Sequence, residues 1–322
     1  AFVSILVGRR VLSRRDTTSD PPLLNQRAAS LIGRTAIVSE AIVNGRGRIK
    51  LDDTTWTAEG PDAAQGAKVI LAGRREEVLQ KAVKEIGDSA DYRVHDVIDF
   101  PKSEALIDSV TDQHGSLSVL INNAGIMGTK VEQKYSRTNF WDVSIDRWNN
   151  VMAVNANGVF HMVKASVGYM LRQRWGRIIG VTTSIDSMYK QGMCPYGPSK
   201  ASHEALVALM ASELENTGVT ANVLIPGGTS DTNMIPLDIE IERKDLIQPD
   251  IMGPPSVWLA SEESELTNGQ RFIAYNWDDT LPLSQRIEKA SAPAAWLRGH
   301  AWGPDFGGCG LTRCQVPKRK ER

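Results

Sequence analysis

The chain is poor in cysteine, nearly neutral in charge and without a long hydrophobic run. Its three cysteines, Cys194, Cys309 and Cys314, have neither metal-ligand spacing nor the even number of a disulfide framework, which favours a reducing, cytoplasmic environment. None of the five histidines has a sequence partner at metal-ligand spacing, so we predict no metal site. A net charge of −1 over 322 residues argues against nucleic acid as a partner.

The apolar stretch at the start of the chain is too short to cross a membrane. Residues Ala1 to Val7 fall far below the roughly 18 residues that a spanning helix needs. Because arginines follow at positions 9, 10, 14 and 15, the stretch is interpreted as the end of a lost membrane anchor or as a disordered tail. With a Pro-containing linker behind it, residues 1–27 are predicted to be tail and linker. Residues 300–322 lack apolar periodicity and are predicted to be a second disordered tail.

The most informative pair in the chain is Tyr196 and Lys200. They stand four residues apart at the start of the helix-favouring run Ala201 to Glu215, so both side chains are predicted to lie on one helix face. A neighbouring ammonium favours the phenolate and lowers the pKa of a phenol from about 10. The pair is therefore suited to giving a proton to a carbonyl oxygen. A solvated helix with an amphipathic tyrosine has the same spacing, and the surroundings must decide.

Four further motifs surround this pair. A strand-like run from Gly176 ends in the hydroxyls Thr182, Thr183 and Ser184. The buried-strand pattern Leu117 to Ile121 runs into Asn122-Asn123-Ala124-Gly125, and a helical segment carries Asn155. The apolar strand Val219 to Ile225 ends at Pro226-Gly227-Gly228-Thr229. Each motif alone is an ordinary strand, turn or helix. Taken together, they place polar residues directly after several predicted strands.

In this order and spacing, the motifs resemble those of the short-chain dehydrogenase/reductase family, from about Gly66 to about Arg298. The resemblance implies a doubly wound α/β domain with a Rossmann-type parallel sheet. It also implies that the protein reduces a small-molecule carbonyl, or oxidises the corresponding alcohol, by hydride transfer with a nicotinamide cofactor. A homo-oligomer is compatible with this family.

The resemblance also implies a role for each polar residue. Tyr196 is the expected proton donor and acceptor, and Lys200 is expected to lower its pKa and hold the nicotinamide ribose. Asn155 is expected to hold a water in the proton relay. The family usually has Ser where this chain has Thr183, with Ser184 one residue later, so either hydroxyl could orient the substrate oxygen.

The phosphate-binding turn of this fold is missing. A dinucleotide-binding fold holds the pyrophosphate at the N-terminus of its first helix, behind a Gly-rich turn. The family motif Thr-Gly-x-x-x-Gly-x-Gly has only a poor counterpart here, Thr35-Ala36-Ile37-Val38 followed by Gly45-Arg46-Gly47. Because a strand-like run rather than an apolar helix follows Gly47, we interpret this match as a decoy. The predicted sheet therefore lacks its first βα unit.

The first third of the chain has a pattern of its own. Short strands are predicted at Thr35 to Ile42, Gly47 to Leu51, Thr54 to Ala58 and Ala67 to Leu71, as in a small barrel. The segment of about 28–70 resembles the OB-type C-terminal barrel of NfeD-like membrane proteins, without its last strand. Because the chain also begins with Ala1 rather than Met, we interpret it as two joined fragments, with a natural fusion as the alternative.

The cofactor is predicted from the first dehydrogenase strand that remains. This strand ends at Arg74 and Arg75, where an NAD enzyme would usually place an acidic residue against the ribose diol. Guanidinium groups bind phosphate, so NADP(H) is favoured and NAD(H) is the alternative. The resemblance implies that Asp96 contacts adenine. It also implies that the cofactor is contacted by the two turns that supply Asn123, Ala124, Gly125, Pro226, Gly227 and Thr229.

These observations predict a partial β domain at 28–66 and a dehydrogenase-like domain at 67–299. The predicted function is that of an NADP(H)-dependent oxidoreductase, either active or with its activity lost. The alternative is a non-catalytic, truncated or fused remnant that acts as an interaction module. The protein is expected in the cytoplasm, or at a membrane through a missing N-terminal segment. Either Thr35 to Ile42 fills the place of the missing strand or, as we favour, the isolated protein is unstable.

Overall fold

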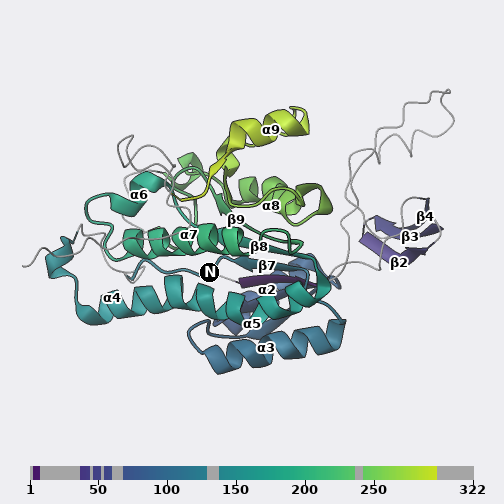
Figure 1. Cartoon of the computed structure of the whole chain (residues 1–322), viewed down its shortest axis with the longest axis horizontal. Coiled ribbons are helices and arrows are strands. Elements are labelled where there is room, and N and C mark those ends of the chain that lie inside the picture. Colours follow the sequence, from purple (N-terminus) through teal and green to yellow (C-terminus); the bar gives the residue numbers. More distant parts are fainter. Residues whose placement is uncertain are drawn as a thin grey trace, which may run out of the picture.

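The computed structural model describes the backbone of residues 3–7, 37–43, 46–51 and 54–59, and all atoms of residues 68–128, 138–235 and 242–295. Within these residues the strands form two sheets (Figure 1). The larger has eight strands in the order β11-β10-β9-β8-β7-β1-β5-β6, and the smaller has the order β2-β3-β4. The predicted tail 300–322 and most of the predicted tail and linker 1–27 lie outside the described residues.

The larger sheet is mainly parallel, as predicted. Its neighbouring strands pair in parallel on either side of β1, so their carboxyl ends meet at one edge of the sheet. These strands are β5 (Lys68–Gly73), β6 (Ala90–Val94), β7 (Val119–Asn122), β8 (Gly176–Val181), β9 (Val219–Ile225) and β10 (Gln270–Ile273). A short strand, β11 (Ser291–Pro293), closes the far side in antiparallel pairing with β10.

The place of the missing first strand is taken by β1 (Val3–Val7), which lies between β5 and β7. It is antiparallel to both neighbours, with Ile5 opposite Ile70 and Leu120. Of the two predicted alternatives, Thr35 to Ile42 does not fill this place; residues 3–7, assigned to the tail, form the strand, and the instability of the isolated protein stays a prediction. The physical reason is that two facing strand edges need backbone partners, which any short extended run can supply.

Helices cover both faces of the larger sheet, and Figure 1 shows α7, α5 and α3 as a row of roughly parallel helices. The α-helices are α2 (Glu76–Ile86), α3 (Phe100–His114), α4 (Ile145–Met152), α5 (Gly158–Gln173), α6 (Ile185–Tyr189), α7 (Tyr196–Glu213), α8 (Gly253–Leu259) and α9 (Leu283–Ala290). A π-helical turn, η2 (Ala153–Asn157), joins α4 to α5. Short 3₁₀ turns are η1 (Phe140–Asp142), η3 (Arg243–Asp245), η4 (Pro249–Met252), η5 (Glu262–Ser264) and η6 (Ala274–Asn276).

Two apolar clusters form the core, one on each face of this sheet. Because side chains alternate along a strand, Leu120 of β7 packs into the cluster with α3, α5 and α7. Its neighbour Val119 packs into the other cluster, with Trp258 of α8 and Ala290 of α9. Burial on both faces explains why the strands read as continuous apolar runs in the sequence. No helix in the described part of the chain is long and apolar enough to span a bilayer.

The smaller sheet is an antiparallel meander of β2 (Ile37–Val43), β3 (Arg46–Leu51) and β4 (Thr54–Glu59). These strands lie where three of the four barrel strands were predicted. The fourth predicted segment, Ala67 to Leu71, instead belongs to β5 of the larger sheet. The described residues thus give three strands to this sheet, and the OB-type barrel stays a prediction.

Candidate active site

The site is built around the first turn of α7, which begins at Tyr196. A Cβ at Gly197 would lie 2.3 Å from the Met188 carbonyl oxygen, so only glycine allows the end of α6 to approach this turn so closely. Tyr196 and Lys200 lie on neighbouring turns, with the Lys200 Nζ 6.0 Å from the centroid of the Tyr196 ring. Tyr196 and Lys200 therefore lie on one face of α7, as predicted.

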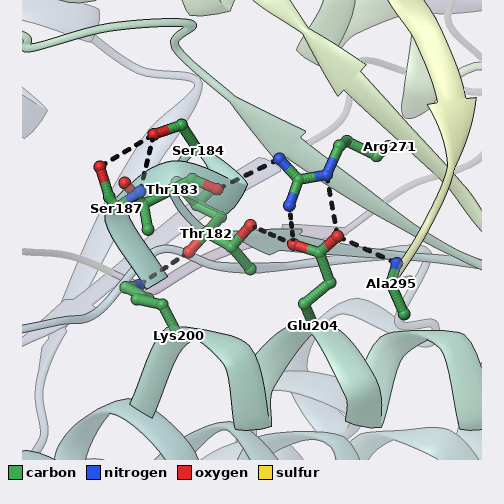
Figure 2. Close-up of polar contacts among 9 residues, drawn as sticks. Thr182, Thr183, Ser184, Ser187, Lys200, Glu204, Arg271 and Ala295 are labelled. Atoms are coloured by element: carbon green, nitrogen blue, oxygen red, sulfur yellow. Dashed lines mark hydrogen bonds and ion pairs between the residues drawn. The ribbon is translucent and has the colours of Figure 1, made fainter. Parts of the chain in front are cut away.

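Lys200 is almost completely buried between α7 and the end of β8. Its Nζ donates a hydrogen bond to the Val181 carbonyl oxygen at 2.8 Å. Burial disfavours the charged ammonium and lowers the pKa of Lys200 to about 8. Figure 2 shows the side chain directed from α7 toward the residues that follow β8, beside Thr182 and Thr183.

Tyr196 has a pKa that differs from the expectation. Burial raises the pKa of the phenol above its ordinary value, and a hydrogen bond with the Thr183 side chain acts in the opposite direction. Desolvation of the phenolate is the largest effect, and the opposing effect comes from Thr183; the predicted lowering of this pKa by Lys200 was wrong. Tyr196 therefore holds its proton at neutral pH, and the predicted strand-end hydroxyl of Thr183 favours the ionised phenol.

Thr183 and Ser184 have different surroundings. The Ser184 hydroxyl caps α6, because its Oγ accepts a hydrogen bond from the Ser187 N–H and lies 2.8 Å from the Ser187 Oγ. Figure 2 shows Ser184 and Ser187 facing each other. Of the two predicted hydroxyls, Ser184 is engaged in the helix cap, and Thr183 is the one that lowers the phenol pKa.

Asn155 lies in the π-helical turn η2 and is fully buried. Its Oδ1 accepts from the Ile126 N–H at 2.8 Å, and its Nδ2 donates to the Ile126 carbonyl at 2.9 Å. The same Nδ2 lies 2.9 Å from the Ser199 Oγ, which donates to the Tyr196 carbonyl at 2.7 Å. Asn155 thus connects the segment after β7 to the first turn of α7.

The turn after β7 comes close to the same groups. A Cβ at Gly125 would lie 3.2 Å from the Lys200 Nζ and 3.5 Å from the Asn155 Oδ1. Asn123 is exposed at this edge of the sheet and Ala124 is partly buried. Gly125 therefore marks the point where the predicted cofactor turn meets two predicted catalytic residues.

The other predicted cofactor residues lie at the same edge. Pro226, Gly227 and Thr229 follow β9, and Gly227 has φ +101. A Cβ at Gly227 would lie 2.7 Å from the Tyr275 Cβ, so both the backbone conformation and the space require glycine. The turn is thereby held against the chain that follows β10.

Arg74 and Arg75 are both exposed at the carboxyl end of β5. An Arg74 Nη1 lies 3.6 Å from a carboxylate oxygen of Asp96, which follows β6. Asp96 is partly buried, and its other oxygen accepts from the Ile98 N–H. Arg75 is the residue before α2 and makes no side-chain capping bond there. Arg74 thus lies beside Asp96, and the adenosine end of the site stays a prediction.

Comparison with known proteins identifies the family. Residues 62–239 match the family model for short chain dehydrogenases. The chain belongs to this family. Residues 28–76 match the model for the NfeD-like C-terminal, partner-binding domain. Both resemblances predicted from the sequence are confirmed.

Individual relatives agree with this placement. The chain is 30% identical over 165 residues to the 3-oxoacyl-(acyl-carrier-protein) reductase FabG of Vibrio cholerae, a match that covers 51% of this chain and 64% of that protein. It is 29% identical over 219 residues to the 2,5-dichloro-2,5-cyclohexadiene-1,4-diol dehydrogenase LinX of Sphingobium indicum, covering 64% of this chain and 84% of LinX. The chain thus spans less than two thirds of the length of FabG.

Among solved structures, a gluconate 5-dehydrogenase from Burkholderia cenocepacia in complex with NADP and tartrate is 26% identical with a TM-score of 0.55. The match covers 63% of this chain and 82% of that one.

One part of this short-chain dehydrogenase does not fit a dinucleotide. Strand β1 runs antiparallel, so its last residue, Val7, lies opposite Lys68 at the edge away from the site. At the near edge Val3 lies opposite Asn122, whose side chain is 1% exposed and has no hydrogen-bond partner for either amide atom. The residues predicted for the two ends of the cofactor lie at the carboxyl edge of the sheet, but among the described residues no helix N-terminus follows β1 to hold the pyrophosphate.

Sequence reasoning missed a buried ion pair in this short-chain dehydrogenase, Glu204 of α7 with Arg271 of β10. The signal was present, because Glu204 stands one turn after Lys200 on a helix stripe that continues to buried Val207. Ser199 was also missed, since its role depends on tertiary contact with Asn155. Within the described residues there is no cluster of side chains suited to a metal ion.

Proposed function

We propose that this protein is an NADP(H)-dependent oxidoreductase that interconverts a small-molecule carbonyl and the corresponding alcohol. The observation that carries the proposal is the placement of Tyr196 and the buried Lys200 on one helix face, together with the Thr183 side chain, which lowers the phenol pKa. A threonine hydroxyl and a protonated phenol at the carboxyl edge of a parallel sheet are suited to binding one substrate oxygen. The groups lie where ligands bind in open α/β sheets.

In this mechanism the residues of the chain handle the proton. Thr183 orients the carbonyl oxygen, and Tyr196 donates its phenolic proton to that oxygen as negative charge develops on it. Because burial raises the phenol pKa, the proton stays on Tyr196 until the substrate oxygen takes it. When bound, the nicotinamide cofactor supplies or accepts the hydride.

Lys200 and Asn155 support this transfer. The pKa of Lys200 at about 8 keeps the amine protonated through much of the neutral range, and its Nζ has protons left after the bond to Val181. We assign it to the cofactor ribose and to restoring the phenolic proton. Asn155 holds the Ile126 main chain and thereby shapes the wall of the site. A water in the proton relay would be held at this wall.

The preference for NADP(H) is supported by charge at the carboxyl end of β5. Arg74 and Arg75 are exposed there, where a 2′-phosphate would find two guanidiniums. Asp96 already faces Arg74 and would contact the adenine side. The similar gluconate 5-dehydrogenase was solved with NADP, which agrees with this choice. NAD(H) is the alternative cofactor.

The proposed substrate class rests on the reactions for which two similar proteins are named. The similar FabG is named for reduction of a 3-oxoacyl group and the similar LinX for oxidation of a cyclic diol. Both names describe chemistry between a carbonyl and an alcohol on a small organic group. We extend only this shared chemistry to the present chain.

A second candidate function is non-catalytic binding of a partner protein. It is favoured by the antiparallel direction of β1, which leaves the pyrophosphate without a helix N-terminus among the described residues. The match of residues 28–76 to a partner-binding domain supports it as well. In this case the Tyr196 site would be a remnant of a lost activity.

The test is a titration of the full chain with NADPH and with NADH, followed by tryptophan fluorescence. We expect weak binding, because the pyrophosphate contacts are few, and tighter binding of NADPH than of NADH. Oxidation of the reduced cofactor is then measured with a 3-oxoacyl thioester, a cyclic diketone and a keto sugar acid. Tighter binding of NADH would remove the argument from Arg74. Binding without turnover on any carbonyl would favour the second candidate.

A further inference from the structure

Glu204 of α7 and Arg271 of β10 form an ion pair that is buried between the helix and the larger sheet. Their side chains are 1% and 4% exposed. The Arg271 Nε donates to the Glu204 Oε1 at 2.8 Å, and the Arg271 Nη2 donates to the Oε2. Figure 2 shows the guanidinium and the carboxylate facing each other in this two-point contact. Such a geometry fixes direction as well as distance.

Both partners make further contacts with the residues that follow β8. The Thr182 Oγ1 donates to the Glu204 Oε2 at 3.0 Å, and the Arg271 Nη1 donates to the Thr183 carbonyl at 3.2 Å. The Ala295 N–H completes the set by donating to the Glu204 Oε1 at 3.0 Å. The ion pair therefore connects α7, β10 and the end of β8 at one point.

Together with Lys200, the pair holds three consecutive residues. The Val181 carbonyl accepts from Lys200, the Thr182 hydroxyl donates to Glu204 and the Thr183 carbonyl accepts from Arg271. Strand β8 ends at Val181 and α6 begins at Ile185, so Thr183 lies beyond the ladder of regular strand hydrogen bonds. The orientation of Thr183 thus depends on contacts from outside its own strand.

A contribution to stability alone does not account for this arrangement. Well-packed apolar residues of similar volume often replace a buried ion pair with no loss of stability, because desolvation of the two charges offsets their attraction. Glu204 lies one turn from Lys200, and Arg271 is bonded directly to Thr183, whose side chain lowers the pKa of the Tyr196 phenol. Its location points to the geometry of the proton-handling groups.

We propose that Glu204 and Arg271 are positioning residues that hold the Thr183 hydroxyl against the Tyr196 phenol. This inference rests on the proposed function for the identity of the reacting groups. The pair itself touches neither substrate nor proton. It acts through Thr183, by fixing the distance between α7 and the chain that follows β8.

The kinetic test replaces both charges at once, as Glu204→Met with Arg271→Met, because loss of one partner alone leaves a buried charge. We expect a folded protein whose kcat falls on the order of 100-fold, with KM and NADPH affinity nearly unchanged. In a Thr183→Ala background the same double change should cost little more, since both act on one contact. A folded double variant with wild-type kcat, or a full additional loss in the Thr183→Ala background, would overturn the proposal.

A second measurement does not depend on turnover. In protein labelled with ¹³C at the tyrosine ring, the Tyr196 signal is assigned by its absence in Tyr196→Phe, and its titration is followed. Because Thr183 lowers the pKa of this phenol, the double variant and Thr183→Ala should both titrate at higher pH than wild type. An unchanged titration in the double variant refutes the positioning role even if no substrate is ever found. Absent turnover with a shifted titration would instead count against the proposed function alone.

Two further variants complete the design. The matched control removes a more exposed ion pair, Asp279→Asn with Arg286→Met, and should leave both kcat and the titration unchanged. If the Met-Met variant fails to fold, Arg271→Lys keeps the charge but has no planar fork to reach Glu204 and Thr183 together. It should then lower kcat and raise the phenol titration, and wild-type behaviour in this variant would also overturn the proposal.

Discussion

Asn155 binds the main chain of Ile126 through both atoms of its side-chain amide. The two hydrogen bonds are 2.8 Å and 2.9 Å long. They satisfy both the N–H and the carbonyl of Ile126, as a neighbouring strand would do in a sheet. They join positions 29 residues apart, the turn after β7 and the π-helical turn η2. π-turns often occur at functional sites because the extra residue redirects a side chain. Here it directs a buried amide to the wall of the candidate active site.

The first prediction follows from these bonds. Asn155→Ala leaves the Ile126 N–H and carbonyl without their partner, and each unpaired buried group costs about 1–3 kcal/mol. We expect the free energy of unfolding to fall by about 2 kcal/mol or more, measured by urea denaturation. The control is Asn150→Ala, an exposed residue of α4. Equal stability of the two variants would show that the Ile126 contacts are not formed.

The second prediction concerns chemistry. Tyr196→Phe removes one hydroxyl with almost no change of volume, so the protein should stay folded while turnover of any accepted carbonyl is abolished. Cofactor affinity should be nearly unchanged. The matched control is Tyr189→Phe, since Tyr189 is 70% exposed and lies in the neighbouring helix α6. Retained turnover in Tyr196→Phe would remove this residue from its role.

The third prediction is a pH dependence set by Lys200. Its pKa falls from 10.5 to about 8 on folding, so between these values the unfolded state binds more protons and stability rises with pH. Lys200→Met lacks this titration. Its stability difference from wild type should change by about 2 kcal/mol in favour of wild type between about pH 7 and pH 9.5. A difference that is constant with pH would mean that the amine keeps its ordinary pKa.

The sequence predicted the parallel sheet and most of the site because these depend on local patterns. Buried strands such as Val219–Ile225 are continuous apolar runs, and Tyr196 and Lys200 share a helix face by spacing alone. The family motifs then ordered these pieces, and the residues they named converge at one edge of the sheet. Gly125, close to both Lys200 and Asn155, is the clearest example.

What the sequence did not predict depends on contacts between distant segments. The place of β1 was missed because a five-residue run carries no signal for which strands it pairs with. Arg271 was missed because nothing in a short strand indicates that a charge from α7 meets it. The expected pKa of Tyr196 had the wrong sign because sequence spacing reveals the neighbouring ammonium but not the desolvation.

The fourth prediction tests the adenosine end of the site. Arg74→Gln with Arg75→Gln removes both guanidiniums and keeps polar side chains of similar length. A hydrogen bond to a charged group contributes about 1.5–3 kcal/mol, so NADPH affinity should fall by about 10-fold or more while NADH affinity changes little. The control is Arg172→Gln, an exposed arginine in the last turn of α5. If NADPH and NADH lose affinity equally, the arginines do not read the 2′-phosphate.

The last prediction concerns the antiparallel strand in the middle of the larger sheet. Ile5 lies opposite Ile70 of β5 and Leu120 of β7, so Ile5→Pro removes a backbone N–H at the centre of β1 and disfavours its pairing. Without β1 the facing edges of β5 and β7 lose their partner, which exposes two strand edges to solvent and to other chains. We expect faster amide hydrogen exchange in residues 69–72 and 119–122, and a greater tendency to aggregate. The control is Thr280→Pro, which places a proline in the exposed turn before α9. Unchanged exchange in β5 and β7 after Ile5→Pro would mean that residues 3–7 do not hold the centre of the sheet.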